Sequence, residues 1–96
     1  MIVAALSCLV VDDEPQIRRL LRVSLHAQGY HVIEAARAAE AITMTATERP
    51  DIIILDLMLP GEGGLSLCQK LRAQTDIAIV MLTAMGELSD RIVGLE

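Results

Sequence analysis

Acidic residues follow two apolar segments of this chain directly. Asp12 and Asp13 come after the mainly apolar residues 6–11, and Asp56 comes after residues 52–55. A buried core does not select carboxylates, because an unpaired charge is costly to remove from water. Carboxylates do bind hard divalent cations and can act as nucleophiles in phosphoryl transfer. These three residues are therefore the first candidates for chemistry.

The elements that would position these acids follow from the hydrophobic pattern. Short β-branched runs alternate with segments of helical spacing, which is typical of βα units in a parallel sheet. The pattern predicts strands at 6–11, 31–34, 52–55 and 77–82, and helices at 15–29, 38–48, about 65–71 and about 88–95.

Two of the predicted helices have clear boundaries and an apolar stripe. Pro15 suits a helix start, Gly29 a helix end, and Pro50 stops the second helix. The residues expected to face the sheet are Ile17, Leu20, Leu21 and Leu25 in the first helix, and Ala38, Ala41, Ile42 and Thr45 in the second.

One domain of α/β class follows from this order of elements, with a doubly wound parallel sheet in the flavodoxin-like order 2-1-3-4. Ligands of such sheets bind at the carboxyl ends of the strands. Strands one and three are neighbours in this order, so Asp12, Asp13 and Asp56 should converge within a few ångström. Thr83 follows the fourth strand and should lie at the same edge.

Three carboxylates this close repel one another. Two like charges about 4 Å apart cost on the order of 4 kcal/mol at an effective dielectric constant of 20. Mg²⁺ would offset this repulsion, since it takes carboxylate, carbonyl and water oxygens as ligands. Such a site could transfer a phosphoryl group, with Asp56 as the nucleophile and the Thr83 hydroxyl as a hydrogen-bond donor.

Each of these residues also has a purely structural interpretation. Asp12 and Asp13 could cap a helix, Asp56 could be a solvated residue at a strand end, and Thr83 could be a turn residue. The joint placement of all four at one sheet edge favours the chemical interpretation.

Composition excludes several other functions. The net charge is −5 and the chain has one Tyr, no Phe and no Trp, so neither nucleic acid nor an anionic membrane is an expected partner of these residues. The N-terminal apolar stretch lacks the positive flank of a signal peptide, and no run is long enough to span a membrane. Cys8 and Cys68 fit no metal-binding spacing, and we interpret them as reduced core residues of a cytoplasmic protein.

The segments 9–15 (LVVDDEP), 53–61 (IILDLMLPG) and 80–84 (VMLTA) resemble, in order and spacing, the CheY-like receiver domain of two-component response regulators. The resemblance implies that Asp56 is the phosphoacceptor and that a sensor histidine kinase is the partner. It implies that Asp13 and Asp56 bind Mg²⁺ directly, Asp12 through a water, and Met58 through its backbone carbonyl. Thr83 matches the switch hydroxyl.

The last residues, 90–96, resemble the OmpR/PhoB-type subfamily, in which a winged-helix DNA-binding domain follows the receiver. Arg91 and Glu96 match charged positions of a dimerisation face, although both could simply be solvated. Relative to a full receiver, the chain lacks the fifth strand with its Lys and aromatic residue, and the fifth helix. We therefore expect 1–96 to be an incomplete receiver whose fourth strand is an exposed edge that promotes self-association.

The predicted function is a phosphorylation-dependent regulatory domain, not an enzyme, whose output is transcription through a domain outside this chain. Two alternatives stay open. One is a protein-interaction module that is never phosphorylated. The other is a Mg²⁺-dependent phosphohydrolase, which is disfavoured because Met58 occupies the position where such enzymes commonly have a second acid.

Overall fold

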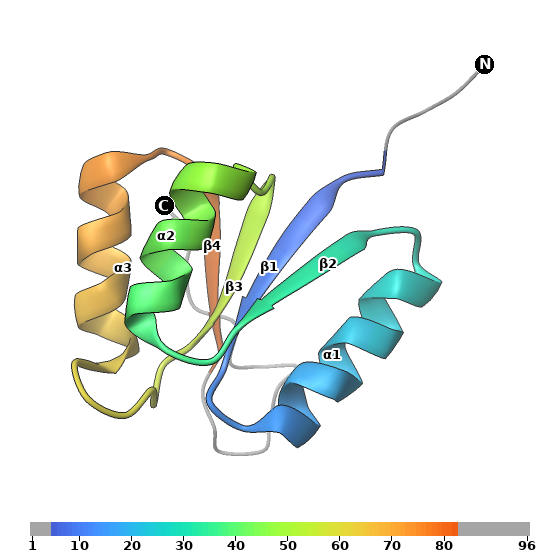
Figure 1. Cartoon of the computed structure of the whole chain (residues 1–96), viewed down its shortest axis with the longest axis horizontal. Helices are drawn as coiled ribbons and strands as arrows, with labels where there is room; N and C mark the ends of the chain where they lie inside the picture. The colour runs from blue at the N-terminus through green and yellow to red at the C-terminus, as the bar shows by residue number, and fades with distance from the viewer. Residues whose placement is uncertain (1–4, 83–96) are drawn as a thin grey trace.

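The structure, a computed structural model, describes residues 5–82. Figure 1 shows a central sheet with helices on both faces. The elements, in chain order, are β1 (Ser7–Val11), α1 (Pro15–Ala27), β2 (His31–Ala35), α2 (Ala38–Glu48), β3 (Ile52–Asp56), α3 (Gly63–Gln74) and β4 (Ala78–Leu82).

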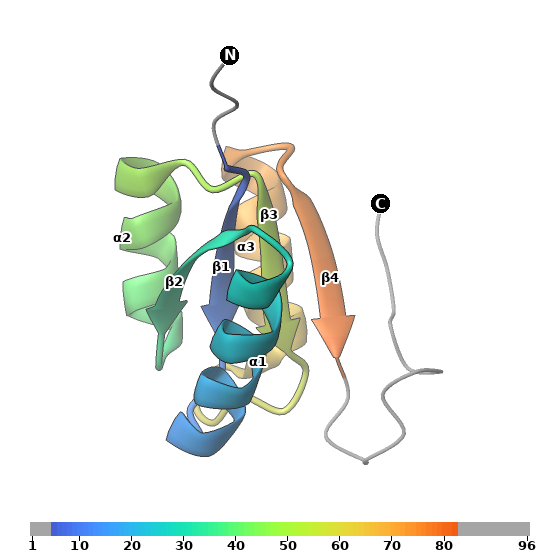
Figure 2. The same ribbon diagram turned by 90° about the vertical axis from the view of Figure 1, so that its right-hand side faces the viewer.

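The sheet is parallel and has the order β2-β1-β3-β4 within these residues, which confirms the predicted topology. β1 is in register with β2 on one side and with β3 on the other, and Val11 pairs with both Ala35 and Leu55. The strands point in the same direction in Figure 2, so their carboxyl ends meet at one edge.

The core lies between the sheet and the helices α2 and α3, which pack side by side on one face (Figure 1). Alternation along the strands accounts for this: Ile53, Leu55, Ile79 and Met81 are buried, whereas the other residues of these two strands, except Asp56, are half-buried or exposed. Ala41 and Thr45 of α2, and Leu67 and Leu71 of α3, complete the core on the helix side.

α1 packs against β1 and β2 on the opposite face, and none of its residues is buried. Leu21 and Leu25 are half-buried as predicted, but Ile17 and Leu20 are 37% and 56% exposed. The prediction that all four face the sheet is therefore wrong in half of its residues. The apolar stripe of α1 covers a wider part of the helix surface than the part that contacts β1 and β2.

A few boundaries also differ from the prediction. β1 begins at Ser7 rather than Leu6, β4 begins at Ala78 rather than Ile77, and α3 begins two residues before Leu65. Cys8 is buried and burial raises the pKa of its thiol to about 11, which keeps it protonated at neutral pH. Cys68 is half-buried and packs against the core, so it lies at the edge of the core rather than inside it.

The helix that was predicted near 88–95 lies outside the described residues. Within residues 5–82, no helix is long and apolar enough to cross a membrane.

Candidate functional site

The candidate site is built where β1 and β3 end side by side. Because Val11 pairs with Leu55, Asp12, which directly follows β1, lies next to Asp56, the last residue of β3. The Asp12 N–H still donates a hydrogen bond to the Ala35 carbonyl of β2 (3.1 Å). The backbone of Asp12 is therefore held at the end of the sheet ladder.

The three predicted acids do converge. Carboxylate oxygens of Asp12, Asp13 and Asp56 lie within 4.8 Å of one another. Asp12 and Asp56 are each only 8% exposed, whereas Asp13 is exposed. The site therefore has two sheltered carboxylates at its base and one at its solvent-facing side.

Backbone N–H groups orient the two sheltered carboxylates. Glu14 donates its N–H to Asp12 Oδ1, and Met58 donates its N–H to Asp56 Oδ1, each at 2.9 Å. Both bonds join residues two positions apart, as in an Asx turn. Local backbone geometry therefore restricts each carboxylate before any ligand binds.

The electrostatics of Asp12 reflect the crowding of negative charge. Burial raises its pKa, the hydrogen bond from Glu14 lowers it, and the charges of Asp56, Asp13 and Glu14 raise it further, with a net shift upward. Ionised Asp12 is therefore disfavoured where it stands, and a bound cation would relieve this cost.

These residues fit a hard divalent cation. Mg²⁺ binds oxygens at about 2.0–2.1 Å in an octahedron and keeps several waters, so opposite ligands are roughly 4.2 Å apart. A carboxylate cluster within 4.8 Å has the spacing of oxygens that could surround one such ion. The exposed side at Asp13 leaves room for those waters.

Gly64, at the start of α3, was not singled out by the sequence reasoning. A Cβ there would clash with the Asp56 carbonyl oxygen, and would lie 2.7 Å from Leu57 Cα and 2.9 Å from the Leu57 oxygen. The Gly64 N–H donates to that Leu57 oxygen (3.1 Å). Glycine is therefore required at this position, because the start of α3 lies directly against the backbone that carries Asp56. The only signal of this in the sequence was the pair of consecutive glycines.

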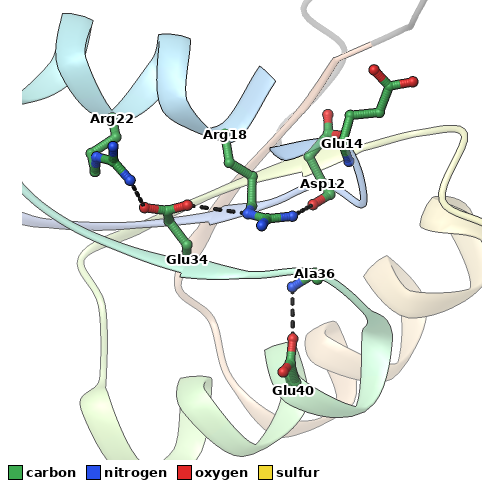
Figure 3. Close-up of polar contacts among 7 residues, drawn as sticks. All are labelled: Asp12, Glu14, Arg18, Arg22, Glu34, Ala36 and Glu40. Carbon is green, nitrogen blue, oxygen red and sulfur yellow. Dashed lines mark hydrogen bonds and ion pairs between the residues drawn. The ribbon is translucent and has the colours of Figure 1, made fainter. Parts of the chain in front are cut away.

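A second group missed by the sequence reasoning is a charged network beside the acids (Figure 3). Glu34 of β2 accepts hydrogen bonds from Arg18 Nε (3.1 Å) and Arg22 Nη1 (2.7 Å), both from α1. Arg18 Nη1 also donates to the backbone carbonyl of Asp12 (2.8 Å). The signal in the sequence was two arginines four residues apart, which lie on one face of a helix.

The remaining predicted site residues are placed only in part. Met58 is 63% exposed. Thr83, Arg91 and Glu96 lie outside the described residues. Lys70, the only lysine of the sequence, forms an ion pair with Glu62 (3.2 Å).

Comparison with known proteins agrees with the fold and the acidic cluster. The family profile of the response regulator receiver domain matches residues 8–96, and the chain therefore belongs to this family. It is 50% identical over 88 residues to a probable transcriptional regulator, ycf27, of Cyanophora paradoxa, and 46% identical over 88 residues to the transcriptional regulatory protein ResD of Bacillus subtilis. Each match covers 92% of this chain but 37% of the relative.

Two solved structures show the same architecture. The BeF3-activated receiver domain of RstA from Klebsiella pneumoniae superimposes with a TM-score of 0.78 at 33% identity, over 88% of this chain and 72% of that one. TrrA from Thermotoga maritima, in complex with Mg²⁺ and BeF, superimposes with a TM-score of 0.79 at 38% identity, over 84% and 71%.

Proposed function

We propose that this receiver domain accepts a phosphoryl group on Asp56 from a sensor histidine kinase. The observation that carries the proposal is the convergence of the Asp12, Asp13 and Asp56 carboxylates at the carboxyl edge of the sheet. Of these three residues, Asp56 is the one at the end of strand β3. Its carboxylate is sheltered from solvent and is oriented by the Met58 N–H.

In the proposed reaction, an Asp56 carboxylate oxygen attacks the phosphorus of a phosphohistidine. The new O–P bond yields an aspartyl phosphate, and the P–N bond breaks with its electron pair returning to the imidazole, which then takes up a proton. Asp12, Asp13, Asp56 and the Met58 carbonyl would hold Mg²⁺, which supplies charge neutralisation for the transferred group. Thr83 is proposed to donate its hydroxyl to that group afterwards.

The proposed output is transcription in the cytoplasm. The relatives of this chain carry the names of transcriptional regulators, and the chain spans 37% of their length. DNA contact would fall to a domain outside these 96 residues, because their net charge of −5 opposes binding to a polyanion. The domain would act as a regulator rather than as an enzyme.

Self-association is a further part of the proposal. β4 is one of the two edge strands of the sheet within residues 5–82, with Val80 and Leu82 half-buried. An apolar edge strand favours pairing with a second copy, and Arg91 and Glu96 are proposed to contribute charged contacts. Sedimentation that shows a single stable monomer at tens of micromolar would contradict this part.

One assay tests the proposed phosphorylation. The chain is incubated with Mg²⁺ and acetyl phosphate, and its intact mass is followed. One phosphate per chain is expected in the wild type and none in Asp56→Asn. The matched control is Asp51→Asn, which changes an exposed carboxylate at the opposite end of β3 and should leave the adduct intact.

The other outcomes of this assay separate the alternatives. If the incubation is repeated with a phosphate ester, multiple turnover of that ester would support a phosphohydrolase. A wild type that binds Mg²⁺ but forms no adduct would support an interaction module that is not phosphorylated.

A further inference from the structure

Arg18, in the second turn of α1, reaches back to the turn that bears the acidic cluster (Figure 3). Its Nη1 donates to the Asp12 carbonyl (2.8 Å), and its Nε donates to Glu34 Oε1 (3.1 Å). Arg22 Nη1 donates to the second oxygen of Glu34 (2.7 Å). The Arg18 side chain is only 19% exposed, so its guanidinium is held from two sides in a restricted space.

The carbonyl that Arg18 contacts is part of the peptide group between Asp12 and Asp13. Three groups of Asp12 are now fixed: its N–H by Ala35, its carboxylate by Glu14 and its carbonyl by Arg18. A peptide group is planar, so a fixed carbonyl also fixes the nitrogen of Asp13. Because Asp13 is exposed, the direction of its backbone is what restricts where its carboxylate can lie.

The same contact avoids a competition between Arg18 and a cation. A guanidinium bonded directly to the acidic carboxylates would occupy the oxygens that a metal needs. Glu34 instead engages Nε, and the planar guanidinium then directs Nη1 at a carbonyl. Positive charge is therefore placed beside the site while the carboxylates stay free.

We propose that Arg18 is a positioning residue for cation binding at the Asp12, Asp13 and Asp56 cluster, and that Glu34 orients it. This inference rests on the proposed function, because it assigns Arg18 to the same site. It goes further in naming a group that contacts neither the cation nor the phosphoryl group.

The test measures the Mg²⁺ dissociation constant of the full chain by calorimetry and by the amide signals of Asp13 and Glu14. Arg18→Gln is expected to weaken Mg²⁺ binding about tenfold, the lower range for loss of a group that orients a metal ligand. The matched control is Arg19→Gln, which removes the same charge from an exposed neighbouring position and should change the constant less than about twofold.

The direction of the effect separates positioning from simple electrostatics. Loss of a positive charge near an acidic site strengthens cation binding if charge alone matters. Weaker binding in Arg18→Gln therefore indicates lost positioning, and equal or tighter binding would overturn the proposal. Arg18→Lys keeps the charge but not the two-directional geometry, so it should also bind Mg²⁺ more weakly; wild-type affinity in this variant would count equally against the proposal.

Two further measurements keep the result interpretable. Glu34→Gln removes a negative charge, which weakens cation binding by itself, so Arg18→Lys, which keeps the charge, is the second variant if Arg18→Gln does not fold. The amide signal of Asp13 in metal-free protein should shift in Arg18→Lys and not in Arg19→Gln.

The failure of the proposed function and the failure of this inference can be told apart. If the wild type binds Mg²⁺ but takes no phosphate, only the proposed function fails. If the wild type takes phosphate and all Arg18 variants bind Mg²⁺ normally, only the role of Arg18 fails.

Discussion

Asp12, which directly follows β1, and Glu34, on the neighbouring strand β2, both have contacts with α1, yet the surroundings of their carboxylates are opposite. Glu34 accepts hydrogen bonds from two guanidinium groups, those of Arg22 and Arg18, and its pKa is lowered. Asp12 is buried among other acids, and its pKa is raised. Two guanidinium groups contact the Glu34 carboxylate, whereas Arg18 contacts only the backbone carbonyl of Asp12 and leaves its carboxylate without a guanidinium partner. Perturbed acids of the second kind are typical of functional sites.

Of the changes that test the difference between Asp12 and Glu34, removal of Mg²⁺ should have the largest effect. Without Mg²⁺ the acidic cluster keeps its full repulsion, so phosphorylation of Asp56 by acetyl phosphate should slow at least about 100-fold when the metal is chelated, since a metal contributes several kcal/mol to such transition states. Asp13→Asn should act in the same direction. The time course of intact mass measures both, and Asp76→Asn, an exposed acid before β4, is the control. Equal rates with and without chelator would contradict the metal site.

Gly64→Ala should disturb the acidic region without altering any charge. The added methyl group meets the Asp56 and Leu57 backbone, so we expect the free energy of unfolding to fall by about 1–3 kcal/mol, the range for overpacked sites. Urea unfolding followed by circular dichroism measures this. Gln69→Ala, at an exposed position of α3, should leave the midpoint nearly unchanged. An unchanged midpoint in Gly64→Ala would show that α3 can shift away from β3.

Asp12→Asn should stabilise the metal-free protein at neutral pH. The variant removes one charge from the cluster, and the repulsion between two charges about 4 Å apart ranges from ~1 kcal/mol in bulk water to ~4 kcal/mol at an effective dielectric constant of 20. The pKa of Asp12 is raised in the folded state, so protonation relieves the wild type as pH falls through that pKa, and the difference should vanish below the unfolded value of 3.8. Denaturant unfolding across this range measures it. A wild type that is the more stable protein at pH 7 without metal would contradict the prediction.

Glu34→Gln should show the opposite pH dependence. The pKa of Glu34 is lowered by Arg22 and Arg18, so its contribution to stability is fully present above the unfolded value of 4.5 and is lost as pH falls through the lowered folded value. At pH 7 we expect the variant to be less stable by about 0.5–1 kcal/mol, since these ion pairs are partly solvated. The same unfolding series measures both proteins. A difference that persists at pH 3 would mean that Glu34 stabilises the fold without its charge.

Arg22→Gln should have the smallest effect, and it tests the Glu34 side of the comparison separately from the Asp12 side. Arg22 is 45% exposed and contacts Glu34 but not Asp12, so its loss should cost about 0.3 kcal/mol and leave the Mg²⁺ affinity unchanged. Calorimetry and urea unfolding of one preparation test both expectations. A loss of Mg²⁺ affinity as large as in Arg18→Gln would mean that the whole network, and not the contact to the Asp12 carbonyl, orients the site.

Within residues 5–82, the sequence alone predicted the elements, their order in the sheet and the meeting of Asp12, Asp13 and Asp56. These features depend on local alternation of apolar residues and on which residue directly follows a strand, and both can be read along the chain. α2 was predicted with its observed boundaries for the same reason, because an apolar stripe and Pro50 define it.

Only the tertiary structure decided what surrounds the acids. Arg18 and Glu34 are 16 residues apart, and their contact to each other and to the Asp12 carbonyl exists because β1 and β2 are in a particular register with α1 above them. The need for glycine at position 64 arises in the same way, since the backbone of β3 occupies the space of a side chain there. A pattern along one segment specifies its own conformation, but the distance between two segments depends on how they pack.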